Sequence, residues 1–65
     1  MPGLVSITDA EKVRTTLSLS KYEFSVALGY SPTAYLYAIE KDWLSRRMAG
    51  KIATKYRRML AEVRK

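Results

Sequence analysis

Cysteine and histidine are both absent from the 65-residue chain. Without them there is no disulfide framework, no thiol nucleophile and no imidazole base, and the commonest zinc ligands are missing. Most compact catalytic sites use at least one of these groups. We therefore expect a protein that is not an enzyme and needs no metal or cofactor, and no small-molecule ligand is evident.

Long apolar runs are absent as well. No segment approaches the roughly 20 consecutive apolar residues of a membrane-spanning helix, and residues 1–7 lack the basic start and apolar run of a signal peptide. We expect a cytoplasmic protein with no membrane partner, in which residues 1–7 form a flexible arm. A chain of this length forms one domain, residues 1–65, and its small core favours self-association into a homodimer.

Acidic residues are scarce in the last third of the chain. Residues 1–42 carry four basic and five acidic side chains, a net charge of −1, whereas residues 43–65 carry eight basic side chains and one acidic, a net charge of +7. Charge concentrated in this way is typical of proteins that bind a polyanion, and nucleic acid is the commonest soluble one. A solvated basic surface that only maintains solubility is the alternative.

A strongly marked helix begins after Ser20. Ser20 and Glu23 have the spacing of a capping box, in which each side chain accepts a hydrogen bond from the other residue's backbone amide. Leu19 can pack on Phe24 across this cap as a hydrophobic staple. Gly29 can then adopt the left-handed conformation that ends a helix at low steric cost, so the pattern predicts a helix over residues 21–28.

A second helix is expected within about one turn of Gly29. Ser31 can serve as its N-cap and Pro32 as its first residue, which predicts a helix over residues 32–41. Two helices joined so tightly cross at a steep angle, and the second one projects from the surface. This arrangement is typical of a helix-turn-helix, whose second helix can enter a groove of DNA.

The remaining pattern also predicts helices. The capping-box spacing of Thr8 and Glu11 indicates a helix over residues 9–17, and the apolar pair Trp43 and Leu44 is expected to close the core.

Ser45 can cap a last helix that continues to Val63 with apolar residues at helical spacing. Its end, within residues 56–65, packs either against a second copy or against the 9–17 helix of its own chain. The fold class is therefore all-α, a compact bundle of four to five helices with a helix-turn-helix.

The chain resembles the Cro/C1-type (XRE-like) helix-turn-helix repressors over residues 9–56. The residues that carry the resemblance are Leu19, Ser20, Phe24, Ser25, Leu28, Gly29, Tyr30, Ser31, Ile39, Glu40, Ile52 and Ala53. The resemblance implies an all-α domain, usually dimeric, that binds inverted-repeat operators in double-stranded DNA, as in small phage and mobile-element autoregulators such as anti-CRISPR-associated regulators. Two features depart from the pattern. Ser25 stands where the family prefers alanine, and the hydrophobic residue and glutamate that end the recognition helix come one residue late, which indicates an insertion either in the turn or in the 32–41 helix.

This apparent insertion leaves two registers open for the 32–41 helix. In the first, the buried residues are Tyr35, Ala38 and Ile39, and the exposed ones are Thr33, Tyr37 and Lys41, with Leu36 beside them. In the second, the buried residues are Leu36, Ile39 and Trp43, and the exposed ones are Ala34, Tyr37, Ala38 and Lys41. Tyr37 and Lys41 are exposed in both registers.

Phosphate contacts are expected where two helices begin. Lys21 lies in the first turn after the Ser20 cap, and Arg46 and Arg47 lie in a first turn where the helix dipole disfavours cations by about 0.3–1 kcal/mol. We expect DNA contacts from Ser20, Lys21, Thr33, Ala34, Tyr37, Lys41, Arg46 and Arg47. We expect a dimer interface formed by Tyr56, Met59, Leu60 and Val63.

The function predicted from the sequence is a dimeric, sequence-specific DNA-binding repressor of its own operon. The alternative is a protein-interaction module or inhibitor that binds a host protein through an apolar surface of Tyr35, Leu36, Tyr37 and residues 56–63. A basic amphipathic helix on a membrane surface ranks last, because a capped globular segment precedes residues 45–65. Common RNA-binding modules are disfavoured because no strand is predicted.

Overall fold

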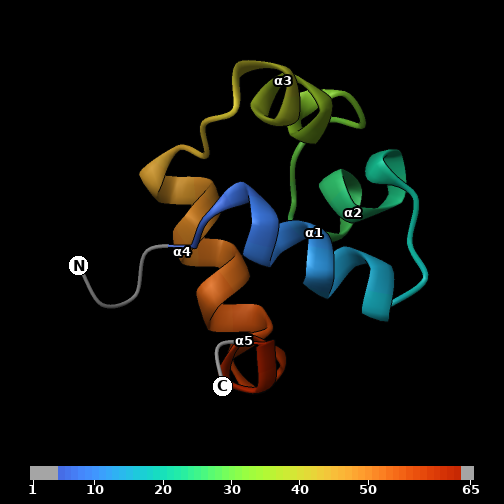
Figure 1. Cartoon of the computed structure of the whole chain (residues 1–65). Helices are drawn as coiled ribbons and strands as arrows, with labels where there is room; N and C mark the ends of the chain where they lie inside the picture. Colours follow the sequence, from blue (N-terminus) through green and yellow to red (C-terminus); the bar gives the residue numbers. More distant parts are fainter. Residues whose placement is uncertain (1–4, 64–65) are drawn as a thin grey trace.

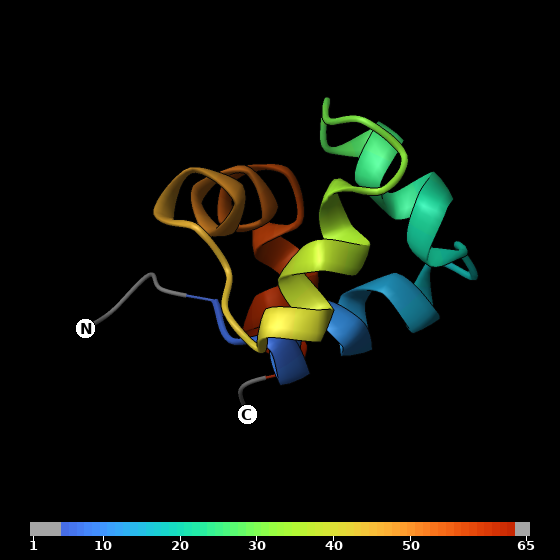
Figure 2. The same ribbon diagram turned by 90° about the horizontal axis from the view of Figure 1, so that it is seen from above.

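Five helices form an all-α fold in the computed structural model, which describes residues 5–63 (Figure 1). They are α1 (Ile7–Thr16), α2 (Lys21–Ala27), α3 (Ala34–Lys41), α4 (Arg46–Lys55) and α5 (Arg57–Val63). Helix α3 lies at one pole and α5 at the opposite pole, with α1 crossing the middle and α4 running along one side. Seen from above, α3 lies over part of α1 and α5 (Figure 2). The pole occupied by α3 is therefore far from the C-terminal helix.

Helix α2 begins and ends as the sequence predicts. The Ser20 amide donates to Glu23 Oε1 at 2.8 Å, and the Glu23 amide donates to Ser20 Oγ at 3.1 Å, which completes the capping box. At the other end Gly29 has a φ of +88°. The Tyr30 amide there donates to the carbonyl of Ser25 at 3.1 Å, the long bond of a Schellman motif.

Helices α1 and α3 end in the same motif without a glycine. Ser18 and Asp42 have φ values of 58° and 53°, in the left-handed region. The next residue in each case, Leu19 or Trp43, donates its amide to the carbonyl five positions earlier. Because a non-glycine residue in this conformation costs about 1 kcal/mol or more, the Schellman bonds and the surrounding packing must hold both turns.

Helix α1 begins two residues earlier than expected. Its N-cap is Ser6, whose hydroxyl accepts from the Asp9 amide at 3.1 Å, so the expected cap at Thr8 is wrong. Thr8 already lies inside the first helical turn, where its backbone is helical. Val5 is buried in the core. The flexible arm expected over residues 1–7 is therefore wrong for residues 5–7, and its first four residues lie outside the described chain.

Helix α3 begins two residues later than expected. Pro32 and Thr33 form a turn, and the Ala34 amide donates to the carbonyl of Ser31 at 3.1 Å. The N-cap position is Thr33, which makes no side-chain capping bond, so the expected N-cap at Ser31 and the expected first helical residue, Pro32, are both wrong. The connection between α2 and α3 spans residues 28–33.

The expected single helix from Ser45 to Val63 is broken at Tyr56. The backbone of Tyr56 leaves the helical region, with φ −118° and ψ 32°, and α5 begins at the next residue. The Tyr56 ring stacks on Phe24 at a centroid distance of 5.8 Å. After the break α5 packs against α1 and Leu60 is only 4% exposed. Of the two alternatives for this end of the chain, packing against its own α1 is the one observed.

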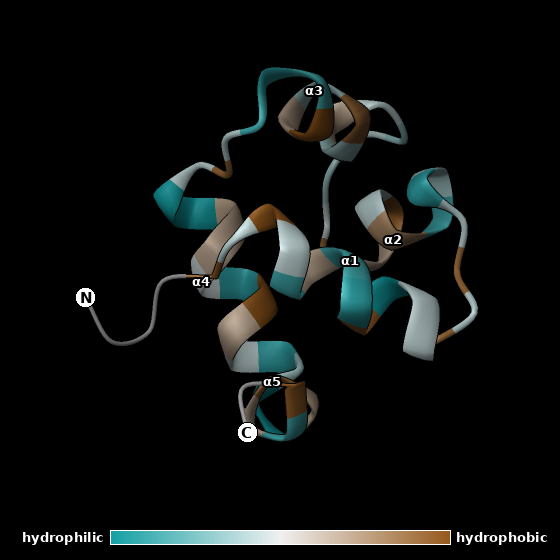
Figure 3. Cartoon of the chain, in the orientation of Figure 1, coloured by the Kyte–Doolittle hydropathy of each residue, from teal (hydrophilic) through white to brown (hydrophobic). Residues whose placement is uncertain are grey.

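The core gathers the apolar faces of all five helices around Phe24. The ring of Phe24 meets that of Tyr35 edge to face at 4.9 Å. Hydrophilic and hydrophobic residues alternate along α4, whose apolar side faces this core (Figure 3). The buried apolar residues are Val5, Ala10, Val13, Phe24, Leu28, Tyr35, Ala38, Met48, Ala49, Ile52 and Leu60.

Candidate nucleic-acid interface

The outer face of α3 is exposed at one pole of the molecule. Tyr35 and Ala38 are buried, whereas Tyr37 is 60% exposed and Thr33 and Lys41 are exposed beside it. This is the first of the two registers that the sequence leaves open. Ala34 and Leu36 are half-buried at the edges of the exposed face. An exposed helix face of this kind can contact a partner along two turns.

Two polar contacts fix this register. The Tyr35 amide donates to Ser25 Oγ at 3.2 Å, and the Tyr35 hydroxyl donates to Glu11 Oε2 at 2.8 Å. Burial, followed by the adjacent Glu11 carboxylate, raises the pKa of Tyr35 far above its ordinary value. The phenol therefore stays protonated and holds α3 against α1. Rotation of α3 by one position would break both contacts and expose the ring.

Trp43 lies at the surface and not in the core. It is 64% exposed, so the expectation that Trp43 closes the core is wrong, while Leu44 is half-buried and packs on the core as predicted. The left-handed turn at Asp42 redirects the chain after α3 and directs the indole outward. The second register, which requires a buried Trp43, is thereby ruled out.

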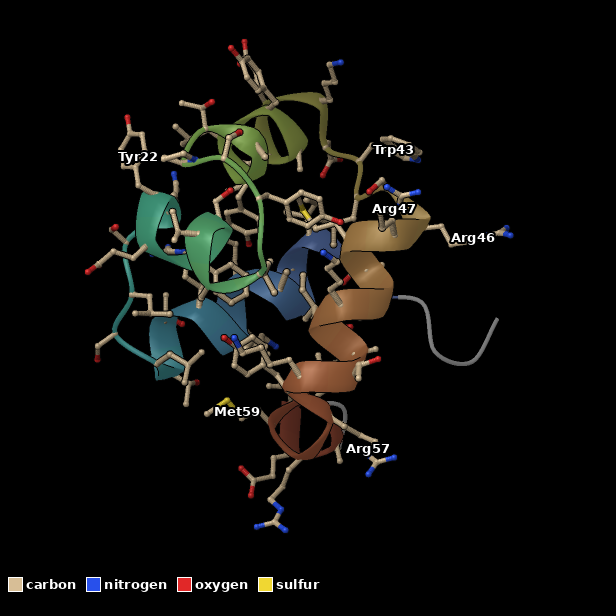
Figure 4. The ribbon with its side chains drawn as sticks, turned by 180° about the vertical axis from the view of Figure 1, so that it is seen from behind. Tyr22, Trp43, Arg46, Arg47, Arg57 and Met59 are labelled. Carbon is tan, nitrogen blue, oxygen red and sulfur yellow. The ribbon has the colours of Figure 1, made fainter. Side chains whose placement is uncertain are left out.

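Two arginines follow Trp43 at the start of α4. The Ser45 hydroxyl caps this helix by accepting from the Met48 amide at 3.1 Å, and both Arg46 and Arg47 are exposed. Figure 4 shows Arg47 on the same side as Trp43, whereas Arg46 extends away from the body of the molecule. The two guanidinium groups therefore reach different regions beside α3.

The start of α2 does not offer the free backbone amide of Ser20 to a phosphate. The Ser20 amide is bonded to the Glu23 carboxylate, so it is not available to a phosphate. The bonds from Ser20 lower the pKa of Glu23, and its negative charge occupies the helix start that was expected to attract an anion. Lys21, which is half-buried, remains the phosphate-binding candidate at this end.

Two lysines that are not among the DNA contacts expected from the sequence belong to a basic groove. Arg47, Lys51 and Lys55 line a groove of about 540 Å³ between α4 and the end of α2. Lys55 Nζ donates to the carbonyl of Ala27 at 2.7 Å, and Lys51 Nζ lies 4.6 Å from the ring centroid of Tyr30. The spacing of these three cations, four residues apart, was the signal that could have placed them on one helix face.

Helix α5 does not offer the expected dimer interface. Leu60 is buried and Tyr56 stacks inside the chain, while Met59 and Val63 are half-buried. Figure 4 shows Met59 and Arg57 at the end opposite α3. The buried Leu60 is therefore unavailable to a second copy, and the surface that the other three residues expose lies at the pole opposite α3.

An apolar hollow lies on the exposed side of α2. Tyr22 and Val26 are 54% and 55% exposed and, with Pro32, line a hollow of about 420 Å³. Figure 4 shows Tyr22 on one side of α3 and Trp43 on the other. The apolar surface expected around Tyr35 and residues 56–63 cannot include Tyr35, because that residue is buried. The exposed apolar hollow lies beside Tyr22 and Val26 instead.

No protein-family model, curated protein or solved structure matches the chain. Within residues 5–63, every helix is too short or too polar to cross a membrane. In the same residues no three acidic side chains come together in a way that could hold a metal ion. The functional assignment consequently rests on the geometry of the α3 pole and its surroundings.

Proposed function

We propose that the chain is a sequence-specific, double-stranded DNA-binding regulator that acts in the cytoplasm, with α2 and α3 as its helix-turn-helix. Helix α3 enters the major groove and presents Thr33, Tyr37 and Lys41 to base edges. Arg46, Arg47 and Lys21 hold the phosphates on either side. A small helix-turn-helix domain acts most simply by occupying an operator, here as a repressor of its own operon.

One observation carries the proposal: the exposed face of α3 lies at one pole between two cationic helix starts. Lys21 begins α2, and Arg46 and Arg47 begin α4. Cations placed on both sides of a projecting helix match the two phosphate backbones that border a major groove. The remaining arginines of the described chain, Arg57 and Arg58, lie on α5 at the far pole, apart from Arg14, which is engaged with Glu11.

Recognition of DNA by α3 cannot use hydrogen bonds from arginine or glutamine to base edges, because α3 contains neither residue. The face offers one phenol, one threonine and one lysine, with the methyl group of Ala34 at its edge. The Tyr37 hydroxyl can bond a base acceptor or a phosphate, and the methyl groups can pack on thymine. With so few donors to base edges, sequence-dependent DNA shape and bridging waters supply part of the discrimination.

A homodimer is part of the proposal, with a lateral contact in place of the α5 contact. Two α3 helices that read successive major grooves lie about 34 Å apart and must face the same side of the dimer. A two-fold contact through α5 would direct them to opposite sides, because α5 lies at the pole opposite α3 (Figure 1). The exposed apolar residues Tyr22 and Val26 lie beside α3 and are suitable for a lateral contact.

The direct test is selection of binding sites from a pool of random DNA duplexes. We expect a recurring sequence to be enriched, arranged as an inverted repeat if the dimer forms. The enriched duplex should then compete against its scrambled version at a fixed salt concentration, because nonspecific phosphate binding depends strongly on salt. Enrichment of no sequence, with equal affinity for all duplexes, would reject the sequence-specific function.

A protein-binding module is the second candidate. The hollow beside Tyr22, Val26 and Pro32 favours it, because single exposed apolar residues are common but a lined apolar hollow marks an interaction site more often. The substitution Val26→Glu distinguishes the two functions. It should leave binding of a single DNA half-site intact if α3 is the functional surface. It should abolish binding of the protein partner if the hollow is the functional surface.

A further inference from the structure

Trp43 is the only tryptophan of the chain and one of its most exposed large apolar side chains. It lines two hollows. One, of about 160 Å³, is shared with residues of α3 and the start of α4, and the other, of about 430 Å³, is shared with residues at the start of α1. The indole therefore borders open space in two places, in contrast to Tyr35, which is fully buried.

The smaller hollow has the size and lining for one flat aromatic ring. A cavity of roughly 150 Å³ is enough to hold benzene, and this hollow has about 160 Å³. Ala34, Ala38 and Met48 give it an apolar floor, and Tyr37 and Trp43 supply aromatic walls. A nucleobase has a π-face that stacks on such rings whatever its sequence identity.

The charges around the hollow favour a ring that belongs to a polyanion. Lys41 lies on its rim, and Arg46 and Arg47 begin the adjacent helix. Two acidic residues, Glu40 and Asp42, are exposed near the end of α3, but neither lines the smaller hollow, whose one charged lining residue is Lys41. The acidic Asp42 lines the larger hollow and not the smaller one. The smaller hollow thus presents aromatic walls and a cationic rim.

We propose that Trp43 and the smaller hollow receive one unpaired nucleobase. A base inside an intact duplex is stacked on both faces and cannot reach the hollow, so binding requires a base freed by a bulge, a kink or a single strand. The chain then holds such a base by stacking on Trp43, with Lys41 and Arg47 on the adjacent phosphates. This rests on the proposed DNA binding and extends it to distorted or unpaired DNA.

The test uses the fluorescence of Trp43, which reports stacking directly because no other tryptophan contributes. Three probes are titrated: a short duplex, the same duplex with one unpaired thymine, and a single-stranded oligothymidylate. Binding is measured separately by the anisotropy of a label at one end of the DNA. We expect the unpaired thymine to quench Trp43 and to raise affinity about 5- to 100-fold over the perfect duplex, the range expected for one stacked base.

Variants separate stacking from general binding. Trp43→Ala should remove the advantage of the unpaired thymine and leave affinity for the perfect duplex within about twofold, whereas Trp43→Phe should retain part of it. Tyr22→Ala is the matched control, because Tyr22 is also an exposed aromatic, lies on the other side of α3 and lines neither hollow beside Trp43. Loss of the proposed lateral contact would affect both duplex probes alike, so the advantage of the unpaired thymine over the perfect duplex should remain. Circular dichroism should show native helix content for all three variants.

Each outcome decides between the two proposals. Equal affinity for all three probes with unquenched Trp43 would overturn the base-binding role and leave duplex recognition standing. Quenching by oligothymidylate without duplex binding would support the base-binding role and overturn the proposed function. Binding to none of the probes would overturn both, and would direct attention to a protein occupant of the hollow.

Discussion

The buried hydroxyl of Ser25 on α2 accepts a hydrogen bond from the backbone amide of Tyr35 on α3, with 3.2 Å between the oxygen and the nitrogen. The same hydroxyl donates to the carbonyl of Ser31 in the connecting turn. The amides of the first turn of a helix have no partner within the helix, and the Ser25 hydroxyl supplies one for the amide of Tyr35.

Ser25→Ala is therefore expected to destabilise the fold by about 1–3 kcal/mol, since it leaves the buried Tyr35 amide without its partner. The Ser31 carbonyl, by contrast, keeps the bond from the Ala34 amide. For a chain of this size each kcal/mol lowers the melting temperature by roughly 4–8 °C. Thermal unfolding followed by circular dichroism measures the change. Ser31→Ala is the control, because the turn uses only the Ser31 backbone. Equal melting temperatures for wild type and Ser25→Ala would show that the hydroxyl contributes nothing.

Acid should weaken the contact between α1 and α3. Glu11 accepts from the Arg14 guanidinium at 2.7 Å and from the Tyr35 hydroxyl, and these donors, Arg14 foremost, lower the pKa of Glu11 below its ordinary value. A carboxyl whose pKa is lower in the folded state stabilises the fold above its unfolded-state pKa of about 4.3. That stability is lost as the pH falls through the folded-state pKa.

Glu11→Gln should therefore reduce stability at neutral pH by about 1 kcal/mol, the upper range for a partly exposed pair, and flatten its fall in acid. Denaturant unfolding at a series of pH values below neutrality gives both quantities. Some acid dependence will remain, because the capping bonds of Ser20 also lower the pKa of Glu23. Glu62→Gln, on the exposed side of α5, should change neither quantity. An unchanged acid dependence in Glu11→Gln would contradict the role of this network.

The features predicted correctly from the sequence are those encoded by local chemistry. The capping box at Ser20 and Glu23 and the turn at Gly29 involve residues within a few positions of each other, so helix α2 was predictable in type and position. The register of α3 was not predictable, because it depends on the Ser25 hydroxyl and on Glu11, which lies 24 residues from Tyr35. No local pattern encodes such distant partners.

The break at Tyr56 and the exposure of Trp43 were missed for related reasons. The apolar spacing from Met48 to Val63 fits one continuous helix, and only the packing of Tyr56 on Phe24 and of α5 on α1 shows that the chain must turn. Trp43 follows a left-handed residue that is an aspartate, and glycine would have been the usual signal. Without a glycine to indicate the turn, the hydrophobicity of Trp43 alone favours a position in the core.

Leu60→Glu tests whether Leu60 belongs to the core of its own chain, where α5 packs on α1. A carboxylate at this buried position loses solvation without gaining a partner, at a cost of several kcal/mol, which is comparable to the whole stability of a domain this small. We expect an unfolded chain with little helical circular dichroism. Ala61→Glu, one residue along on the exposed side, should fold normally. A folded Leu60→Glu monomer would instead restore Leu60 to a dimer interface.

The arginines at the start of α4 should account for part of the salt dependence of DNA binding. Removal of one phosphate-binding cation reduces the slope of log affinity against log salt by about 0.9, so Arg46→Ala with Arg47→Ala should flatten it by up to about twice that value. Stability should be unchanged or slightly higher, because cations leave a helix start. Affinity should fall for specific and random duplexes alike.

A matched control removes the same charge from the opposite pole. Arg57→Ala with Arg58→Ala should leave the salt slope nearly unchanged, because α5 lies away from α3 (Figure 4). Fluorescence anisotropy across a series of salt concentrations compares the two double variants. Equal flattening in both would mean that net charge, and not the position of the arginines, determines the affinity.

Sequence preference should depend on Tyr37, which is 60% exposed at the centre of the outer face of α3. A contact to a base edge contributes about 1–3 kcal/mol of discrimination, whereas a phosphate contact affects the affinity for all sequences together. Tyr37→Ala should therefore reduce the ratio of operator to scrambled affinity by roughly 5- to 100-fold. Because the side chain is exposed, the melting temperature should barely change.

Competition titrations with operator and scrambled duplexes measure this ratio directly, and Thr33→Ala and Lys41→Ala map the rest of the face. Arg57→Ala, on α5 at the opposite pole, is the control outside α3 and should preserve the ratio. If Tyr37→Ala preserves it while Thr33→Ala collapses it, recognition lies at the start of α3, and the helix enters the groove end on. If none of the three positions on α3 alters the ratio, α3 does not read the sequence, and the helix-turn-helix function is wrong.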